Sequence, residues 1–443
     1  MQHRGRHRRR KRGKALRAVL AGTALALTAT ATLISASQAT IADDPGALRP
    51  LTSAADTAKL RLQEQPVPYR TLDRLTSAMG RPVGVDAVLR SADRTLRNAT
   101  DCTEGDRESL PVEPAADRAY CWDRADAAAP DWRPSSVTTS ADADDDGLWG
   151  EHRVVLAGST HTKAGPAADR GLARVAFVDA DDPDRLAYRW VLLVVPTADG
   201  RDYRGLSSQI SGMVWYQDKL LVTTNTGSAD ALYVYDLDRI QRTTVDAAAI
   251  GRVPDGWSAD GYRYVMPAVA AYRYPAGRCT ATGSPCPGTI SLDRGTAPDS
   301  LVLGEGTATG SDRRARLWRY SFSSDPARSG LLAIDAAGRA DAVEAYTTQA
   351  HRIRGVLSHQ PPGSARSTWY LAHPPADLTG HGGLWRQDTG GARVARCGSD
   401  ATHHCWAEHT GSLSYVPQTG EVWSVTNRML FTVPLAAVDK SLG

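Results

Sequence analysis

The chain has 443 residues, 52 Lys and Arg against 49 Asp and Glu, and a formal net charge of +3. Nine of the positive charges lie between Arg4 and Arg17, and removing these nine from +3 leaves −6 for the rest of the chain. A mildly acidic body without a cluster of basic residues lacks the groups that neutralise phosphates, which argues against a nucleic-acid-binding role.

The amino terminus has the pattern of a secretory signal peptide. The basic segment is followed by an uncharged run from Ala18 to Ala42, within which lies the small-residue sequence Ser37-Gln38-Ala39. This order predicts a signal peptide over residues 1–39, cleaved after Ala39 or, alternatively, after Ala42. We therefore expect a secreted, extracellular protein with no membrane attachment after cleavage. The alternative is an uncleaved anchor, because the run is long enough to span a bilayer although it is weakly hydrophobic.

Residues 40–100 differ in composition from the rest of the chain. Two stretches rich in Ala, Leu and Arg, Leu51–Gln65 and Val85–Asn98, have apolar spacings that suit helices, and Pro66 to Pro68 separate them. We expect a linker with one or two helices that packs on a domain spanning residues 101–443.

Six cysteines lie in the exported part and fall into three local pairs. An even number of cysteines in an oxidising compartment favours disulfides. We predict the pairs Cys102–Cys121, Cys279–Cys286 and Cys397–Cys405. The alternative at the last pair is a zinc site made of Cys397, His403, His404 and Cys405, although this spacing is not that of a zinc finger.

The stretch from Ile210 to Ile240 is typical of three short antiparallel strands. Apolar runs at Gly212–Tyr216, Leu220–Thr224 and Leu232–Tyr235 are separated by turns rich in Asn, Asp and Gly. Related meanders recur from about Trp132 to the end of the chain. We predict an all-β fold, a β-propeller of about five blades with six possible, and keep a β-sandwich or barrel as the alternative.

Three of these units open with the same kind of anchor. Gly212, Gly355 and Gly411 each begin an apolar run. In a propeller the inner strands crowd the central channel, and glycine permits the close backbone approach that this requires. The shared glycines therefore predict the starts of inner strands.

Part of the chain resembles a family of secreted actinobacterial proteins without an assigned function. The matching segments are Thr138 to Gly147, Val154 to Leu156, Val175 to Asp179, Trp190 to Val194, Gly212 to Tyr216 and Val234 to Leu237. The resemblance covers about residues 132–241 and implies secretion and a propeller-like fold, but no activity. The chain departs from the family at Gln209, where the resemblance leads us to expect His.

An acidic loop offers a candidate metal site. Asp142, Asp144 and Asp146 precede Gly147 with the spacing that begins a Ca²⁺ loop, because hard cations bind several carboxylate oxygens and glycine allows the sharp turn. The ligand that would complete such a loop is absent, since Gly150 and Arg153 stand at the ninth and twelfth positions. We predict a structural Ca²⁺ ion here, with a solvated hairpin turn as the alternative.

Counting three residues back from each shared glycine gives a candidate ligand-binding ring. These positions are Gln209, Arg352 and Glu408, with His351 and His409 beside them. Such groups could hold a sugar, a carboxylate ligand or a metal ion, or could form a polar plug that closes the channel.

No catalytic motif is present in the sequence: it has no Gly-x-Ser-x-Gly elbow, no phosphate-binding loop and no His-Glu-x-x-His helix. We therefore predict a monomeric binding or scaffold module whose partner is a carbohydrate, a cell-wall component or another cell-surface ligand. The alternative is a propeller glycoside hydrolase that uses Glu305 and Glu408 as its two carboxylates, with Asp142 as a third candidate.

Overall fold

The computed structural model describes residues 45–129, 131–162, 172–224, 230–277, 284–306, 314–350, 352–361, 364, 366–375, 380–398 and 403–442. The chain divides into two units, Met1–Pro45 and Gly46–Gly443, and the description below concerns the second. The predicted signal peptide, residues 1–39, lies outside the described residues. In the part that the structure describes, no helix is both long and apolar enough to cross a membrane.

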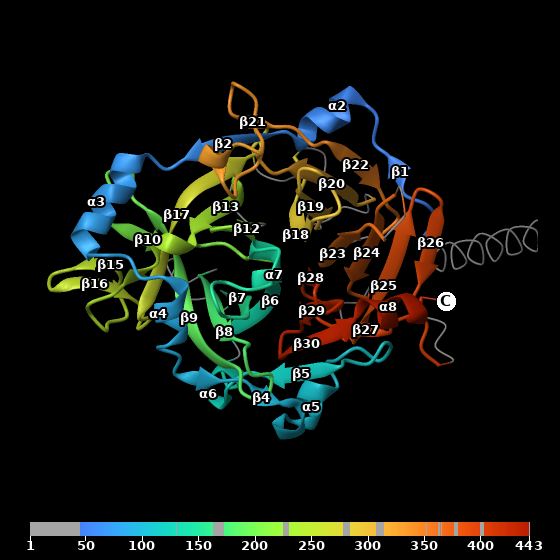
Figure 1. Cartoon of the computed structure of the whole chain (residues 1–443), viewed down its shortest axis with the longest axis horizontal. Coiled ribbons are helices and arrows are strands. Elements are labelled where there is room, and N and C mark those ends of the chain that lie inside the picture. Colours follow the sequence, from blue (N-terminus) through green and yellow to red (C-terminus); the bar gives the residue numbers. More distant parts are fainter. Residues whose placement is uncertain are drawn as a thin grey trace, which may run out of the picture. The chain divides into compact units, whose positions relative to one another are not determined.

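The unit Gly46–Gly443 is built mainly from β-strands, which confirms the predicted all-β class (Figure 1). Its first two antiparallel runs are joined by a parallel pairing of β9 with β17 into one large sheet. The first run consists of β6 (Trp132–Thr139), β7 (Val154–His161), β8 (Ala173–Asp179) and β9 (Ala187–Pro196). The second consists of β11 (Met213–Tyr216), β12 (Lys219–Thr223), β13 (Asp230–Asp236) and β17 (Tyr264–Arg273).

Three further antiparallel sheets follow along the chain. The third run contains β18 (Pro287–Asp293), β19 (Ser300–Glu305), β20 (Arg316–Ser321) and β22 (Glu344–Thr347). The fourth contains β23 (Gly355–His359), β24 (Thr368–His373), β25 (His381–Asp388), β26 (Gly391–Val394) and β27 (Trp406–Glu408). The fifth contains β28 (Leu413–Val416), β29 (Glu421–Val425), β30 (Met429–Pro434), β5 (Arg118–Cys121) and β4 (Arg97–Asn98).

The runs are arranged around their first strands, which gives a propeller-like fold. Strands β6, β11, β18, β23 and β28 contact one another in this order, and β28 contacts β6. Figure 1 shows the five runs placed around these strands. Each run packs on its two neighbours through a separate apolar core, and the core between the fifth and first runs completes the cycle.

Alternation of side chains along the strands produces these cores. Trp215 belongs to the core between the first and second runs, whereas Val214 and Tyr216 beside it belong to the core between the second and third. Because successive residues of a strand point to opposite faces, a sheet covered on both faces needs apolar residues at successive positions. This is why β11 has the continuous apolar sequence MVWY.

Residues 46–121 run along the outer edges of the five runs (Figure 1). The N–H of Leu48 donates to the carbonyl of Asp388 at the end of β25. Strand β1 (Arg49–Pro50) then pairs with β22, β2 (Leu62–Pro66) with β17, β3 (Arg94–Thr95) with β9, and β5 with β30. This amino-terminal segment therefore adds backbone hydrogen bonds to all five runs.

The helices of the segment differ from those that the composition predicts. Over Leu51–Gln65 the chain forms only a short helix and a 3-10 turn before it enters β2, since its polar backbone groups are satisfied by pairing with β17. The longest helix, α3 (Tyr69–Met79), lies between the two predicted stretches, and its Leu72 and Leu75 are buried. The other helices are α2 (Ala54–Thr57), α4 (Val85–Leu89), α5 (Glu104–Arg107), α6 (Arg124–Ala127), α7 (Ser140–Ala143) and α8 (Leu435–Ser441).

The remaining strands are short and lie at the margins of the runs. They are β10 (Tyr203–Gly205), β14 (Gln241–Arg242), β15 (Ile250–Val253), β16 (Gly256–Ala259) and β21 (Arg339–Ala340). The 3-10 turns are η1 (Ala58–Leu60), η2 (Ala99–Asp101), η3 (Leu237–Arg239) and η4 (Pro326–Arg328).

Two of the predicted disulfides are present in the structure. Cys102 bonds to Cys121, and Cys397 bonds to Cys405. The second bond removes both thiolates from the alternative zinc site, so that alternative is wrong. Cys286 is also disulfide-bonded, but its predicted partner Cys279 lies outside the described residues.

Candidate functional site

The starts of the inner strands approach one another at glycines. A Cβ added to Gly212 would collide with the backbone nitrogen of Ile290 in β18, and one added to Gly411 would lie 2.9 Å from the carbonyl oxygen of Ser135 in β6. Gly355 and Gly288 are crowded by neighbouring backbone in the same way. The close approach that explains the three predicted glycines is therefore observed, and Gly288 is a fourth that the sequence reading missed.

A cavity of about 390 Å³, called the central cavity below, lies at this end of the inner strands. The residues that line it include Ser135, Ser211, Arg354 and Thr410, which lie at the starts of four different runs. Ser211, Arg354 and Thr410 each directly precede one of the crowded glycines. The glycines thus permit the close approach of the inner strands at the point where the adjacent residues begin to line the cavity.

The hydroxyl groups of the cavity wall are engaged in structural hydrogen bonds. Ser135 Oγ donates to the carbonyl of Ile210 at 2.5 Å, and Thr160 Oγ1 accepts from the N–H of Ile210 at 3.1 Å. Thr410 Oγ1 donates to the carbonyl of Ala407 at 2.9 Å. These hydrogen bonds fix the wall and use the single donor of Ser135 and of Thr410.

Four longer side chains of the lining are exposed and make no hydrogen bond or ion pair within the part of the chain that the structure describes. They are Arg133, Gln209, Arg354 and His409. In addition, Asn427 Oδ1 is buried in the wall without a hydrogen-bond partner. The unused polar groups of the site therefore lie on its longer side chains.

The predicted ring is only partly brought together. Gln209 and His409 line the cavity, whereas Arg352 and Glu408 are not among its lining residues. Glu408 instead sits on β27, paired across the strands with His381. The fifth predicted member, His351, lies outside the described residues.

Arg354 is one of the cavity residues that were not predicted from the sequence, together with Arg133 and Asn427. It stands in the anchor Arg354-Gly355-Val356, but the count of three residues back from the glycine selected Arg352. The residue directly before the glycine was the better guide, because this position reaches the cavity in three of the runs. The surrounding protein partly desolvates the guanidinium, and this desolvation together with the charge of Arg352 lowers the pKa of Arg354.

Backbone strain accompanies two of the predicted positions. Arg352 has a φ of 56° and His409 a φ of 45°, both in the left-handed region that side chains other than glycine seldom occupy. Such strained residues concentrate at functional sites, where the surrounding structure holds them in place.

A second cavity of about 430 Å³ adjoins the first and shares Arg133, Pro134 and Asn427 with it. Its wall contains the guanidinium of Arg174, which lies 4.1 Å from the ring centre of Trp132 and 3.8 Å from that of Trp190. The second cavity is thus more aromatic than the first, and the two form neighbouring compartments of one site.

One carboxylate fixes the second cavity. Asp126 accepts from Arg94 at 2.6 Å, from Arg174 at 3.1 Å, from Tyr188 Oη at 2.6 Å and from Trp190 Nε1 at 2.9 Å. Burial alone would raise the pKa of Asp126, but the charge of Arg174 and these hydrogen bonds outweigh it and hold the pKa below its usual value.

Glu305, one half of the carboxylate pair in the hydrolase alternative, is not at either cavity. It is buried and bonds Arg316 through both carboxylate oxygens, at 2.8 Å to Nε and 2.6 Å to the terminal nitrogen. Its partner in that alternative, Glu408, is on a different run. Among the described residues that line the central cavity there is no carboxylate.

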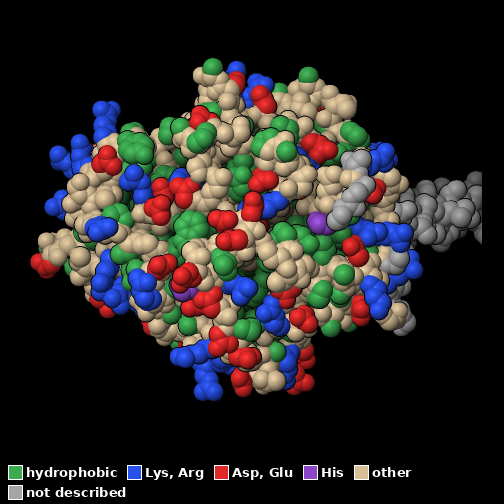
Figure 2. Space-filling view, viewed as in Figure 1, with side chains coloured by type: hydrophobic (Ala, Val, Ile, Leu, Met, Phe, Trp, Pro, Cys, Tyr) green, Lys and Arg blue, Asp and Glu red, His purple; other side chains and the backbone are tan. Residues whose placement is uncertain are grey.

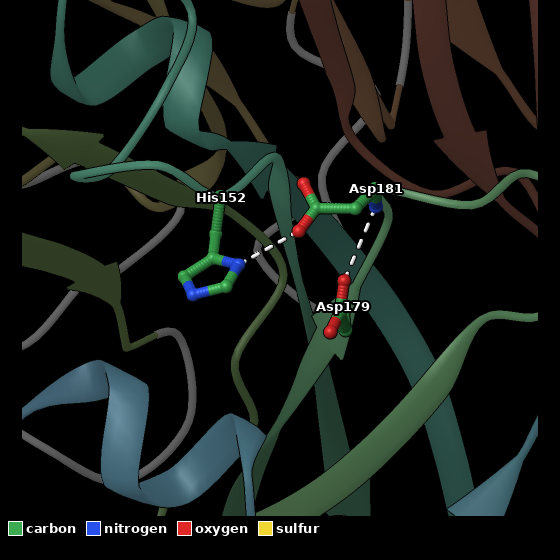
Figure 3. A group of neighbouring side chains, drawn as sticks. All are labelled: His152, Asp179 and Asp181. Atoms are coloured by element: carbon green, nitrogen blue, oxygen red, sulfur yellow. Dashed lines mark hydrogen bonds and ion pairs between the residues drawn. The ribbon is translucent and has the colours of Figure 1, made fainter.

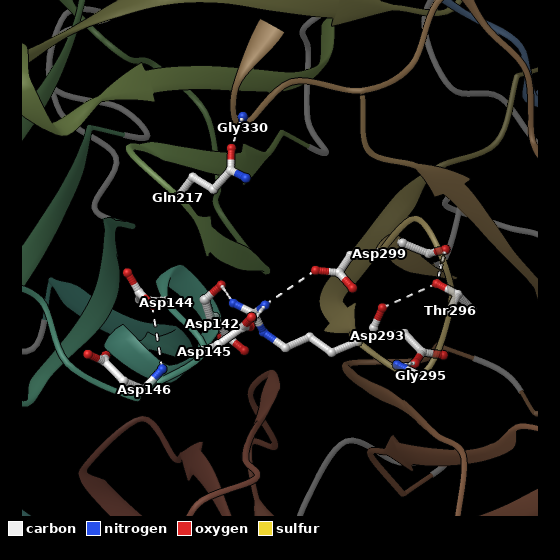
Figure 4. Close-up of polar contacts among 12 residues, drawn as sticks. Asp142, Asp144, Asp145, Asp146, Gln217, Asp293, Gly295, Thr296, Asp299 and Gly330 are labelled. Carbon is white, nitrogen blue, oxygen red and sulfur yellow. Dashed lines mark hydrogen bonds and ion pairs between the residues drawn. The ribbon is translucent and has the colours of Figure 1, made fainter. Parts of the chain in front are cut away.

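The acidic loop lies at the opposite end of β6 from the cavity, where Asp142 belongs to α7 (Figures 1 and 4). Asp142 is buried and accepts from Thr138 Oγ1 at 2.6 Å and from Ser414 Oγ at 2.8 Å. Burial raises the pKa of Asp142. Asp144 and Asp146 are exposed, and each accepts a backbone N–H two residues ahead.

The three predicted calcium ligands do not converge. Two other groups, within the described ranges, do bring their ligand atoms within 4.8 Å of one another: His152 with Asp179 and Asp181, and Asp218 with Asp236 and Asp238. In the first, His152 Nδ1 lies 2.7 Å from Asp181 (Figure 3). Asp181 also accepts the N–H of Arg153. Calcium binding at the acidic loop stays a prediction.

Acidic side chains therefore collect at the ends of the strands that lie away from the cavity. The loop after β6, the end of β8 and the β11–β12 turn all carry aspartates at this end. Figure 2 shows Asp and Glu side chains near the centre of the face on which Figure 1 places α7. At the opposite ends of the strands, the lining of the cavity includes Arg133, Arg354 and His409.

Comparison with known proteins adds little. No family model and no curated protein matches the chain. It is similar to the solved structure of Drosophila Plexin A in complex with Semaphorin 1b, with 10% identity over 68% of this chain and 78% of that chain and a TM-score of 0.28. For Drosophila Semaphorin 1b, extracellular domains 1–2, the identity is 10% over 68% of this chain and 78% of that chain, with a TM-score of 0.26. For Drosophila Semaphorin 1a, extracellular domains 1–2, the identity is 9% over 81% of this chain and 87% of that chain, with a TM-score of 0.26. Likeness at these TM-scores does not establish a relationship.

Proposed function

We propose that this protein is an extracellular binding module, built as a five-bladed propeller, whose central cavity takes a polar ligand of the carbohydrate type. Secretion is supported by the basic and uncharged amino-terminal pattern and by the disulfides Cys102–Cys121 and Cys397–Cys405, which persist in oxidising compartments.

Five blades are supported by the closed order of the inner strands. The strands β6, β11, β18, β23 and β28 each start one antiparallel run, and each contacts the next. The fifth blade is completed by β5 from the amino-terminal segment, so that the two ends of the described chain share one sheet.

The observation that carries the binding proposal is the set of unused polar groups in the central cavity. The hydroxyls of the wall are satisfied, yet Gln209, His409 and the buried Asn427 Oδ1 have no partner within the described chain. Buried polar groups are normally hydrogen-bonded, so an unpaired one in a cavity wall points to a partner from outside the chain. The volume of the cavity is in the range of small-ligand sites, about 300–1,000 Å³.

Carbohydrates fit these groups because a sugar offers several hydroxyls that both donate and accept hydrogen bonds. The amide of Gln209 and the ring of His409 can serve either role. The adjoining cavity, with Trp132 in its wall, gives room for a further sugar unit.

Binding to a glycan array, followed by titration with the best glycan, tests the proposal. We expect Gln209→Ala and His409→Ala each to weaken binding about fivefold to tenfold, as expected for a lost hydrogen bond. Gln65→Ala on β2 is the matched control, because Gln65 is exposed and lies outside both cavities. Equal affinity of all three variants and the unaltered protein, or no binding to any glycan, would refute the proposed site.

A further inference from the structure

The central cavity contains cationic groups that no described carboxylate balances. Its lining includes Arg133, Arg354 and His409, but no Asp or Glu among the described residues. Neither arginine makes an ion pair within the described chain. The cavity therefore concentrates positive charge in a body that is otherwise mildly acidic.

Elsewhere in the molecule, buried arginines are paired with acids. Arg174 faces Asp126, Arg316 faces Glu305, and Arg319 faces Asp293 at 2.9 Å. Partial removal of a cation from water costs free energy unless an anion compensates it. Desolvation and the charge of Arg352 lower the pKa of Arg354, and no acid of the described residues pairs with it. The contrast separates Arg354 from the arginines that hold the fold together.

Arg354 is also well positioned to bind a ligand. The backbone N–H of Arg354 donates to the carbonyl of Ala372 at 2.9 Å. At the next residue, Gly355, an added Cβ would lie only 2.8 Å from the carbonyl oxygen of Gly411, so the two backbones are closely packed there. The backbone that carries the guanidinium is thus fixed between two runs. A planar guanidinium on a rigid support matches the two oxygens of a carboxylate, sulfate or phosphate.

We propose that the ligand of the central cavity is anionic, and that Arg354 binds its negative group with support from Arg133 and His409. This inference rests on the proposed function and names the class of its ligand: a glycan with an acidic sugar unit. A cavity of about 390 Å³ holds more than an inorganic anion, and the neutral part of the sugar meets Gln209 and Asn427.

The test compares acidic and neutral ligands on matched variants. Glucuronate-containing and glucose-containing oligosaccharides of equal length, together with inorganic phosphate, are titrated against the full exported chain. We expect preference for the acidic oligosaccharide, and a loss of about tenfold to hundredfold in its affinity for Arg354→Gln. Arg354→Lys keeps the charge but not the planar guanidinium, so its affinity for the acidic oligosaccharide should lie between that of the unaltered protein and that of Arg354→Gln. Arg90→Gln, at the exposed C-cap of α4, is the control and leaves affinity unchanged.

The outcomes separate this inference from the proposed function. Equal binding of acidic and neutral oligosaccharides, unchanged in Arg354→Gln, overturns the inference but leaves a carbohydrate site. Phosphate binding that Arg354→Gln removes, without binding of either oligosaccharide, supports the anion site and overturns its assignment to a sugar. Absence of binding by all three ligands overturns both. A melting curve of each variant shows that a loss of affinity does not come from unfolding.

Discussion

Asp126→Ala tests how the wall of the second cavity is held. The substitution removes the acceptor for Arg94, Arg174, Tyr188 and Trp190 at once. Arg174 then keeps its aromatic contacts and the hydroxyl of Tyr262, but its guanidinium, with a side chain only 6% exposed, has no acid. Removing one partner of a buried pair costs about 3–5 kcal/mol, because the other charge stays buried.

The expected loss converts into a measurable shift in melting temperature. A unit of about 400 residues has an unfolding entropy of roughly 0.8 kcal/mol per kelvin, from about 2.1 cal/mol/K per residue. A loss of about 4 kcal/mol therefore lowers the melting temperature by about 5 °C. The folded-state pKa of Asp126 is lowered, so its stabilising contribution is complete above the unfolded pKa of about 4 and is lost as the pH falls through the folded value. The melting temperatures should therefore be measured at pH 7, where this contribution is complete.

Calorimetry of Asp126→Ala beside Asp86→Ala gives the comparison. Asp86 forms an exposed pair with Arg90 on α4, 3.7 Å apart, and pairs of this kind contribute about 0.3–0.5 kcal/mol. We expect the control to melt within about 1 °C of the unaltered protein. If Asp126→Ala melts as the control does, the carboxylate does not hold the wall and the reasoning from its four donors is refuted.

Three further predictions concern the body of the unit. Asp142→Asn keeps an acceptor oxygen but no charge. Because burial raises the folded-state pKa of Asp142, the stability of the unaltered protein should fall as the pH rises from about 4 towards that folded-state pKa. Urea unfolding should show the variant gaining stability relative to the unaltered protein over this range, whereas parallel pH profiles would contradict the argument. Glu305→Ala leaves Arg316 buried without an acid and should cost about 3–5 kcal/mol, whereas replacing the pair by Leu and Met should cost less than the single change, as measured by urea unfolding. Gly212→Val places a side chain against the backbone of Ile290 and should lower the melting temperature by several degrees or prevent folding, and a stable variant would show that the inner strands can move apart.

Local patterns in the sequence predicted local structure well. The three apolar runs between Gly212 and Tyr235 are the strands β11, β12 and β13, because a sheet buried on both faces leaves a continuous apolar run bounded by turns. The shared glycines marked the starts of inner strands, because each of them opens an apolar run.

The candidate site was less predictable, because it depends on which residues meet across the fold. Nothing in the local sequence shows that Glu305 is bonded to Arg316, whereas Arg354 pairs with no acid of the described residues. Gln209 and His409 were found through the glycine anchors, whereas Arg133 lies at the start of β6, which carries no such glycine. The course of residues 46–121 was equally hidden, because strands of two to five residues at sheet edges have too little pattern to be recognised.

The placement of β5 beside β30 has a consequence for biosynthesis. A chain that emerges with its amino end first carries β5 without its partner β30 until Met429–Pro434 are made. During that time the edge of β5 is open to pairing with other chains, which is the usual route to aggregation. The bond between Cys102 and Cys121 joins β5 to the short segment after β4 and can form early, because both cysteines are made long before β30. A chain shortened before β30 therefore keeps this edge of β5 unpaired, even after the disulfide has formed.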